Sequence, residues 1–142
     1  MAEPFLTTVS NSMDELPGLG DRLDAWLEQS GAGPTAAYAL RLALEELLTN
    51  RIKYGFGQYE ERRLEICALH LEDGSFKLTI SDDGDDFDPT AAQDPQGLDN
   101  PVSQRGIGGL GLHMVKKMCA SLEHSRKDGI NTLTVTVLDK GE

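Results

Sequence analysis

The chain has 142 residues, and its hydrophobic fraction of 39% fits one globular domain and excludes disorder by composition. It carries 13 Lys and Arg against 24 Asp and Glu, for a net charge of −11. This acidic balance argues against a nucleic-acid backbone or an anionic membrane as a direct partner. With two cysteines, no apolar run of membrane length and no signal peptide, the sequence predicts a cytoplasmic protein with one domain over 1–142.

Three elements are predicted in the first part of the chain. Residues 5–10 are expected to form a short strand, and residues 13–29 a helix whose early glycines weaken the pattern. Residues 35–54 give the most regular helical pattern, because apolar side chains recur at spacings of three and four residues. A glycine-rich break separates the two helices.

The second part of the chain alternates strands with one further helix. Residues 62–71 and 75–82 are typical of the two strands of a hairpin. The polar stretch 83–104 is long for a loop in a compact domain, and loops of this length are often functional. A glycine cluster then leads into a helix predicted over 109–121, and 130–138 alternates as a last strand.

Three polar side chains share one face of the long helix. Glu46, Asn50 and Lys53 stand at positions i, i+4 and i+7, away from the leucine stripe of the same helix. A carboxylate, an amide oxygen and an ammonium together suit a magnesium-bound phosphate. The alternative interpretation is a solvated helix face that an ion pair stabilises.

A carboxylate is predicted on the apolar side of the second hairpin strand. Asp82 has the parity of Phe76, Leu78 and Ile80, so a strand that reaches it buries its charge. The exocyclic amine of a purine, together with water, would give this carboxylate a partner, and Gly84 would let a flat ring approach the backbone. The alternative is a solvated acidic turn. An EF-hand calcium loop is excluded, because the required glycine and glutamate are absent from its sixth and twelfth positions.

Glycines gather where the third helix is predicted to begin. The segment 106–111 contains, in order, Gly106, Ile107, Gly108, Gly109, Leu110 and Gly111. It matches the dinucleotide pattern G-x-G-x-x-G, but a long polar loop precedes it where that pattern requires a strand. Glycines that lead into a helix still expose backbone N–H groups to an anion such as phosphate. The alternative is a flexible joint.

In this order, the three groups resemble the GHKL ATP-binding superfamily, which includes gyrase, Hsp90, histidine kinases and MutL. The resemblance covers about 35–138. It implies a Bergerat-type α/β two-layer sandwich, with a mixed, mainly antiparallel sheet and helices on one face. It makes Glu46 and Asn50 the N box, places Asp82 against the adenine amine, and makes 88–105 the ATP lid.

Within the superfamily, the chain is similar to stand-alone anti-sigma regulatory serine/threonine kinases. The likeness rests on Leu-Leu-Thr-Asn at 47–50, Phe-Asp-Pro at 87–89 and Gly-Gly-Leu-Gly-Leu at 108–112. It implies ATP and Mg²⁺ as cofactors, with Asn50 on the metal and Glu46 as general base toward a serine hydroxyl. It also implies a STAS-type antagonist as the substrate, a sigma factor as a second partner, and a homodimer.

Three further residues complete the expected nucleotide site. Lys53 and Arg105 are our candidates for neutralising phosphate charge in this acidic protein. Asn131 has the parity of Leu133 and Val135 in the last strand, so we expect it to face the adenine pocket.

Two residues depart from the pattern of the family. Tyr54 stands where histidine is common, and Asp86 stands where a second glycine is common. A non-enzymatic module that binds nucleotide and regulates a sigma factor or phosphatase therefore stays open as an alternative function. A slow ATPase, with water in place of the serine hydroxyl, is a further alternative.

Overall fold

Five short strands, most of them with alternating apolar side chains, form one sheet in the order β1-β2-β3-β5-β4. The structure, a computed structural model, describes residues 3–56, 61–91 and 109–142. All four strand pairings among the described residues are antiparallel, whereas a mixed, mainly antiparallel sheet was expected. The strands are β1 (Phe5–Ser10), β2 (Arg63–His70), β3 (Phe76–Asp82), β4 (Ser121–Lys127) and β5 (Ile130–Val137).

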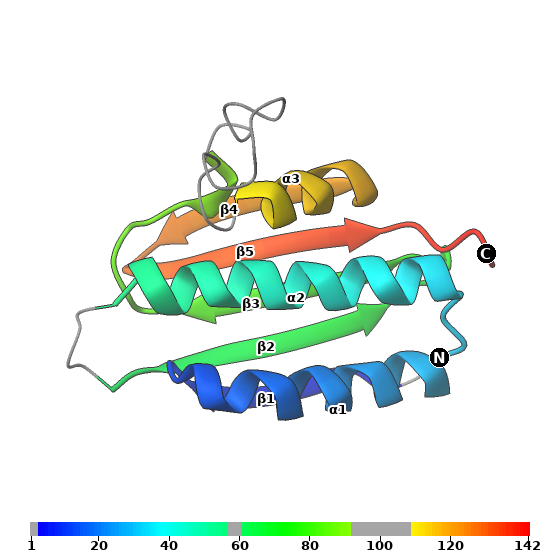
Figure 1. Ribbon diagram of the computed structural model, residues 1–142, viewed down its shortest axis with the longest axis horizontal. Coiled ribbons are helices and arrows are strands. Elements are labelled where there is room, and N and C mark those ends of the chain that lie inside the picture. The colour runs from blue at the N-terminus through cyan, green and yellow to red at the C-terminus, as the bar shows by residue number, and fades with distance from the viewer. Residues whose placement is uncertain (1–2, 57–60, 92–108) are drawn as a thin grey trace.

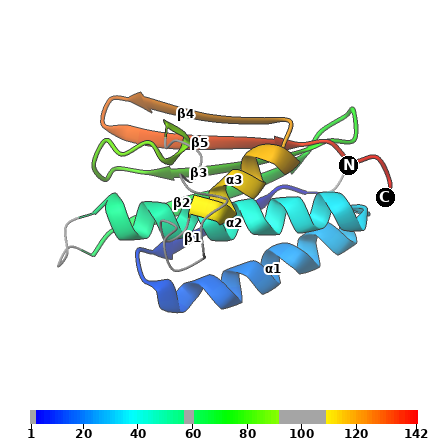
Figure 2. The same ribbon diagram turned by 45° about the horizontal axis from the view of Figure 1, so that its top comes forward.

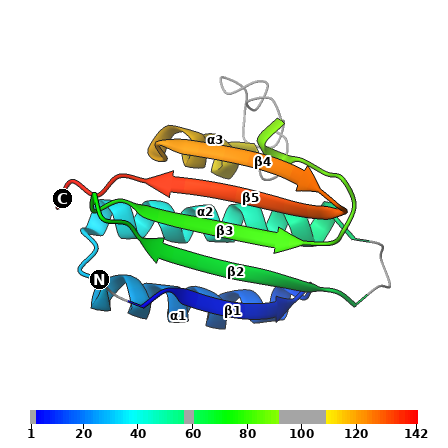
Figure 3. The same cartoon turned by 180° about the vertical axis from the view of Figure 1, so that it is seen from behind.

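Three helices cover one face of this sheet: α1 (Leu16–Gln29), α2 (Pro34–Tyr54) and α3 (Gly109–Met118). In Figure 1 the helices lie in front of the sheet, and Figure 2 shows the two layers after a 45° turn about the horizontal axis. The opposite face, seen in Figure 3, is covered by no helix from the described part of the chain. The predicted two-layer α/β sandwich is therefore confirmed. Within the three described ranges, no helix is both long and apolar enough to cross a lipid bilayer.

Most elements lie close to their predicted bounds, and the main difference follows α3. The helix predicted over 109–121 ends at Met118, and β4 begins at Ser121. β4 was not predicted, because it is an edge strand in which only Leu122 and His124 are partly buried and its apolar alternation is weak. The first turn of the predicted helix 13–29 is a 3-10 turn (Met13–Glu15), which precedes α1.

The apolar stripe of α2 places this helix over the middle of the sheet. The side chains of Leu40, Leu44, Leu47 and Leu48 are at most 1% exposed. They join a core with the inward side chains of β3 and β5, which are Phe76, Leu78, Ile80, Leu133, Val135 and Val137. The β3–β5 register ends with Asp82 opposite Asn131, so two polar residues close the apolar layer beneath the last turn of α2.

A carboxylate from the C-terminal segment caps the start of α2. Gly33 precedes the helix without a side chain to cap it, and its N–H donates to Asp139 Oδ2 over 3.1 Å. Gly141 N donates to Asp139 Oδ1 over 2.9 Å. The hydrogen bonds from Gly141 and Gly33 lower the pKa of Asp139 below its ordinary value. The ionised carboxylate therefore stabilises the folded state.

Asp139→Ala is expected to lower the free energy of unfolding by about 0.5 kcal/mol, the low end of helix-cap effects, because solvent screens the carboxylate. This loss of unfolding free energy should reach its full size above the unfolded-state pKa of Asp139. It should vanish as the pH falls through the lower folded-state pKa of the same group. Urea titrations at neutral and acidic pH would measure it, with Glu72→Ala as an exposed control. An equal loss at both pH values would contradict the cap.

Candidate functional site

The inward parity of β3 and β5 brings Asp82 and Asn131 together at the end of the sheet, as predicted. Asp82 is 5% exposed and Asn131 is 1% exposed. Asn131 Nδ2 donates to the carbonyl oxygens of Gly84 and Asp85, each over 3.1 Å, and its Oδ1 accepts from His124 Nε2 over 3.1 Å. Asn131 thus ties the loop after β3 to the strand pair β4–β5.

The partner of the Asp82 carboxylate is Arg51, a residue that the sequence analysis missed. Arg51 Nε donates to Asp82 Oδ2 over 2.8 Å, and Arg51 Nη2 is paired with Asp82 Oδ1. We had expected a purine amine and water to meet this charge, whereas in the structure a side chain of the protein meets it. Arg51 follows Leu47 and Leu48 by four and three residues, so its place on the buried stripe could have been inferred from its spacing. We call Arg51, Asp82, Gly84 and Asn131 the Asp82 cluster.

Gly84 gives the loop after β3 room to pass close to the last turn of α2. A Cβ added at Gly84 would overlap the carbonyl oxygen of Gly55 and would lie 2.9 Å from the Phe56 ring and 3.0 Å from Arg51 Nη2. Gly84 was expected to let a flat purine ring approach the backbone, and in the structure the Phe56 ring and the Arg51 guanidinium lie beside it.

Gly84→Ala is expected to cost about 1–3 kcal/mol of unfolding free energy, because the new methyl group meets backbone that has no room to shift. Gly18→Ala is the matched control. That position in α1 has no atom within 4 Å of an added Cβ, and the change should stabilise the helix by up to about 1 kcal/mol. Chemical denaturation of both variants would measure the difference. Equal stability of the two variants would show that Gly84 is not packed as described.

The predicted polar face of α2 lies beside the start of α3. Glu46 is partly buried, and burial, followed by the charge of Glu45, raises the pKa of Glu46, while Lys53 opposes the shift. A Cβ added at Gly111 would overlap the Glu46 carboxyl group, so the first turn of α3 packs directly against this carboxylate. α2 and the glycine-rich start of α3 are thus in contact, although Glu46 and Gly111 are 65 positions apart in the sequence.

The other two residues of this face differ in exposure. Asn50 is partly buried, and its Nδ2 donates to the Glu46 carbonyl oxygen over 2.8 Å. This bond uses the amide nitrogen and leaves Oδ1 as the atom suited to a metal. Lys53 is exposed. Glu46, Asn50 and Lys53 together form what we call the Glu46 face.

Several predicted site residues fall outside the described ranges. Arg105, Gly106 and Gly108 are among them, as is most of the predicted lid 88–105. Gly109 and Leu110 are the first two residues of α3. At the described start of the lid, Asp88 Oδ2 lies 3.6 Å from His124 Nδ1, and a 3-10 turn follows (Pro89–Ala91).

The two residues that depart from the family pattern, Tyr54 and Asp86, lie near the Asp82 cluster. Tyr54 is exposed, and its ring lies 5.4 Å from that of Phe87, centroid to centroid, at a tilt of 45°. Asp86 is exposed. Tyr54 therefore packs against the loop that leads toward the predicted lid.

The oxygen donors of the Glu46 face fit a magnesium ion better than a transition metal. Among the described residues, no group of three His, Cys, Asp or Glu side chains could hold a metal ion. Mg²⁺ commonly takes one or two protein ligands and fills its other positions with water and substrate phosphate. A single amide oxygen, from Asn50, fits that pattern.

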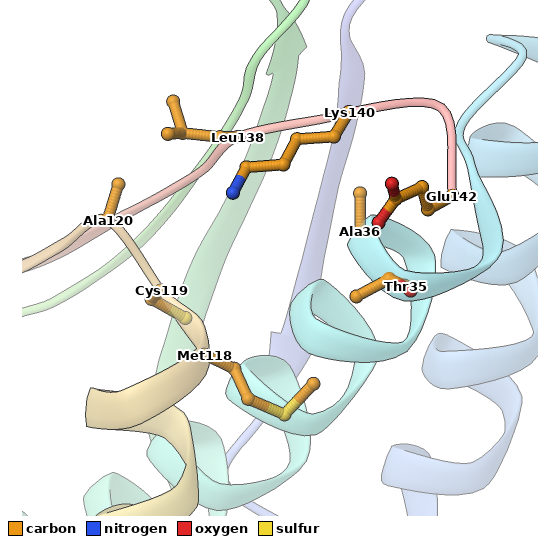
Figure 4. Close-up of a pocket in the computed structure, with 8 residues that line it drawn as sticks. All are labelled: Thr35, Ala36, Met118, Cys119, Ala120, Leu138, Lys140 and Glu142. Atoms are coloured by element: carbon orange, nitrogen blue, oxygen red, sulfur yellow. The ribbon is translucent and has the colours of Figure 1, made fainter.

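A separate cavity of about 280 Å³ lies at the other end of α2 (Figure 4). It is lined by Thr35, Ala36, Met118, Cys119, Ala120, Leu138, Lys140 and Glu142. Thr35 and Arg51 are separated by about 24 Å along the helix, at 1.5 Å per residue, so the cavity is distinct from the Asp82 cluster. Burial raises the pKa of the Cys119 thiol to about 11, so this thiol is protonated at neutral pH and is a poor nucleophile.

Known proteins resemble this chain in sequence. The family model of the histidine kinase-like ATPase domain matches residues 9–137. The serine/threonine-protein kinase BtrW of Bordetella bronchiseptica is 29% identical over 99 residues, covering 70% of this chain and 68% of BtrW. The serine-protein kinase RsbW of Listeria monocytogenes is 24% identical over 115 residues, covering 79% of this chain and 73% of RsbW.

A solved structure supports the fold. The chain with the RsbU and RsbW domains of Rv1364c from Mycobacterium tuberculosis superposes with a TM-score of 0.68 at 16% identity, covering 97% of this chain. This chain spans about a third of that longer chain, 33% of its length. The resemblance that the motifs indicated is confirmed, and the chain belongs to the histidine kinase-like ATPase domain family.

Proposed function

We propose that this protein is an ATP-dependent serine/threonine kinase that acts in the cytoplasm as an anti-sigma regulatory factor. Its substrate is a STAS-type antagonist, its second partner is a sigma factor, and the active form is a homodimer. The observation that carries the proposal is the Glu46 carboxylate, which is partly withdrawn from water, abuts the start of α3 at Gly111 and lies one helical turn from Asn50. The similarity to the serine kinases BtrW and RsbW supports it.

The nucleotide lies between α2 and the lid over 88–105 in this proposal. The Asp82 carboxylate accepts a hydrogen bond from the adenine amine, and Asn131 holds the loop that follows β3. Lys53 and Arg105 neutralise phosphate charge. Backbone N–H groups of the glycine-rich segment donate to phosphate oxygens. These donors belong to Gly106, Gly108, Gly109, Leu110 and Gly111.

Phosphoryl transfer depends mainly on positioning and on neutralising charge. Asn50 Oδ1 would hold Mg²⁺, which would supply charge neutralisation. Glu46 takes the proton of the substrate's serine hydroxyl as that oxygen bonds to the γ-phosphorus. The bond from the γ-phosphorus to the bridging oxygen breaks, and ADP leaves. A raised pKa brings the Glu46 carboxyl closer to working pH, which favours its role as a base.

A second candidate function is a nucleotide-dependent binding module that transfers no phosphate. The observation that favours it is the pair of departures from the family pattern, because Tyr54 packs against Phe87 and Asp86 adds an exposed acid in the loop that leads toward the predicted lid. In this alternative, ATP sets the affinity for a sigma factor or phosphatase by shifting the population of binding-competent states.

The nucleotide site is tested by calorimetric titration of the purified protein with ATP, in the presence and absence of Mg²⁺. We expect saturable binding that Mg²⁺ strengthens. Asn50→Ala should keep the binding seen without Mg²⁺ and lose the strengthening. Absence of saturable binding in the wild type at millimolar ATP would contradict both candidate functions.

A further inference from the structure

Arg51 is a charged side chain at a fully buried position of α2. Its exposed fraction is 0%, although the helix carries it in its last turn beside a polar loop. Buried arginine is tolerated only where its N–H groups are satisfied and its charge is met. The contacts that satisfy the Arg51 guanidinium therefore indicate its role.

The guanidinium is bonded on three of its sides. Nε and Nη2 hold the two oxygens of Asp82 in a bidentate pair. Nη1 donates to the carbonyl oxygen of Asp85 over 3.1 Å and to that of Phe87 over 2.8 Å. The Arg51 Cζ atom also lies 5.6 Å from the centroid of the Phe56 ring. These contacts join α2, the end of β3 and the following loop.

Four N–H donors approach the Asp82 carboxylate in this arrangement, three at Oδ1 and one at Oδ2. Beyond the two bonds from Arg51, its Oδ1 accepts from Gly84 N over 2.9 Å and lies 3.4 Å from Asn131 Nδ2. The Asp82 side chain is 1% exposed. A base that approaches from solvent thus finds the carboxylate covered, and the planar guanidinium lies against Gly84, where a flat ring was expected.

Resting on the proposed function, we infer that Arg51 is an affinity-determining residue that keeps the base pocket closed until nucleotide displaces it from Asp82. The adenine amine and the guanidinium compete for the same carboxylate oxygens. Only the fraction of molecules with the pair open binds ATP tightly, so the apparent affinity falls in proportion to that fraction. Arg51 takes no part in phosphoryl transfer.

The test compares Arg51→Met with the wild type in calorimetric titrations with Mg²⁺-ATP. Methionine keeps the apolar stem and removes the donors, so Asp82 is left to accept from the adenine amine. We expect Arg51→Met to bind ATP at least about tenfold more tightly than the wild type. Arg62→Met is the matched control, because Arg62 pairs with the neighbouring Asp83 over 3.1 Å at the surface. This control should bind ATP as the wild type does.

A second nucleotide identifies the contact that Arg51 blocks. Inosine triphosphate carries a carbonyl oxygen in place of the adenine amine, so it lacks the 6-amino donor that this inference pairs with Asp82. Arg51→Met should therefore prefer ATP over inosine triphosphate more strongly than the wild type does. If Arg51→Met prefers ATP over inosine triphosphate no more strongly than the wild type does, Arg51 does not block the contact with the adenine amine, and the inference is wrong.

The remaining outcomes separate this inference from the proposed function. If the wild type binds ATP and Arg51→Met binds equally or less tightly, Arg51 does not close the pocket, while the nucleotide site stands. If the wild type, Arg51→Met and Arg51→Lys all fail to bind ATP, the nucleotide site and the inference are both wrong. Arg51→Lys also serves where Arg51→Met does not fold. Lysine keeps the charge without the bidentate fork, and it should likewise bind ATP more tightly than the wild type.

Discussion

Asp82→Ala is expected to lower the free energy of unfolding by about 3–5 kcal/mol, because it leaves the Arg51 guanidinium buried without its counterion. The two side chains are 0% and 1% exposed, so water cannot replace the lost partner without opening the fold. Urea denaturation followed by circular dichroism at neutral pH would measure the loss.

A surface pair next to Asp82 provides the matched control. Asp83→Ala removes the carboxylate that pairs with Arg62, where the side chains are 50% and 40% exposed, and it should cost about 1 kcal/mol or less. The double variant Arg51→Met/Asp82→Leu replaces the buried pair with apolar groups and should recover most of the stability lost in Asp82→Ala. Equal losses in Asp82→Ala and Asp83→Ala would contradict the burial of the Arg51–Asp82 pair.

Glu46→Gln is expected to slow phosphoryl transfer by a factor of about 10²–10⁴, the usual contribution of a general base. The amide keeps the size of the side chain and its packing against Gly111, so the affinity for ATP should not change. Single-turnover transfer from ATP to a STAS acceptor would measure the rate, and calorimetry would measure the affinity.

The matched control for Glu46→Gln is the preceding residue on the same helix. Glu45 accepts from Arg41 Nε over 2.8 Å and has no assigned role in the transfer, so Glu45→Gln should keep wild-type transfer. The raised pKa of Glu46 also sets the sign of the pH dependence. The wild-type rate should fall as the pH drops through a value above the ordinary 4.5, and Glu46→Gln should lack this acid limb. An unchanged rate in Glu46→Gln would exclude Glu46 as the base.

The sequence predicted the elements that carry strong periodicity and missed the one that does not. The stripe of Leu40, Leu44 and Leu47 predicted α2, and the alternation of Phe76, Leu78 and Ile80 predicted β3. β4 is mostly exposed and pairs with β5 alone, so register with a neighbour, rather than its own pattern, determines it. Tertiary pairing of this kind is not visible in local spacing.

The site was predictable where parity or helical spacing decided it. Parity placed Asp82 and Asn131 on the inner face, and helical spacing placed Glu46 and Asn50 together. Arg51 was missed because arginine is usually exposed, although its spacing from Leu47 put it on the buried stripe. Its partner, Asp82, lies 31 positions later in the sequence, and only the packing of α2 on β3 joins the two.

The measurement that tests the kinase proposal most directly is mass spectrometry of a STAS-domain protein from the same genome after incubation with this protein and Mg²⁺-ATP. We predict one phosphoserine, formed with the wild type and absent with Glu46→Gln. ATP binding and complex formation without any phosphoserine would contradict the kinase proposal. That result would instead support a nucleotide-dependent binding module.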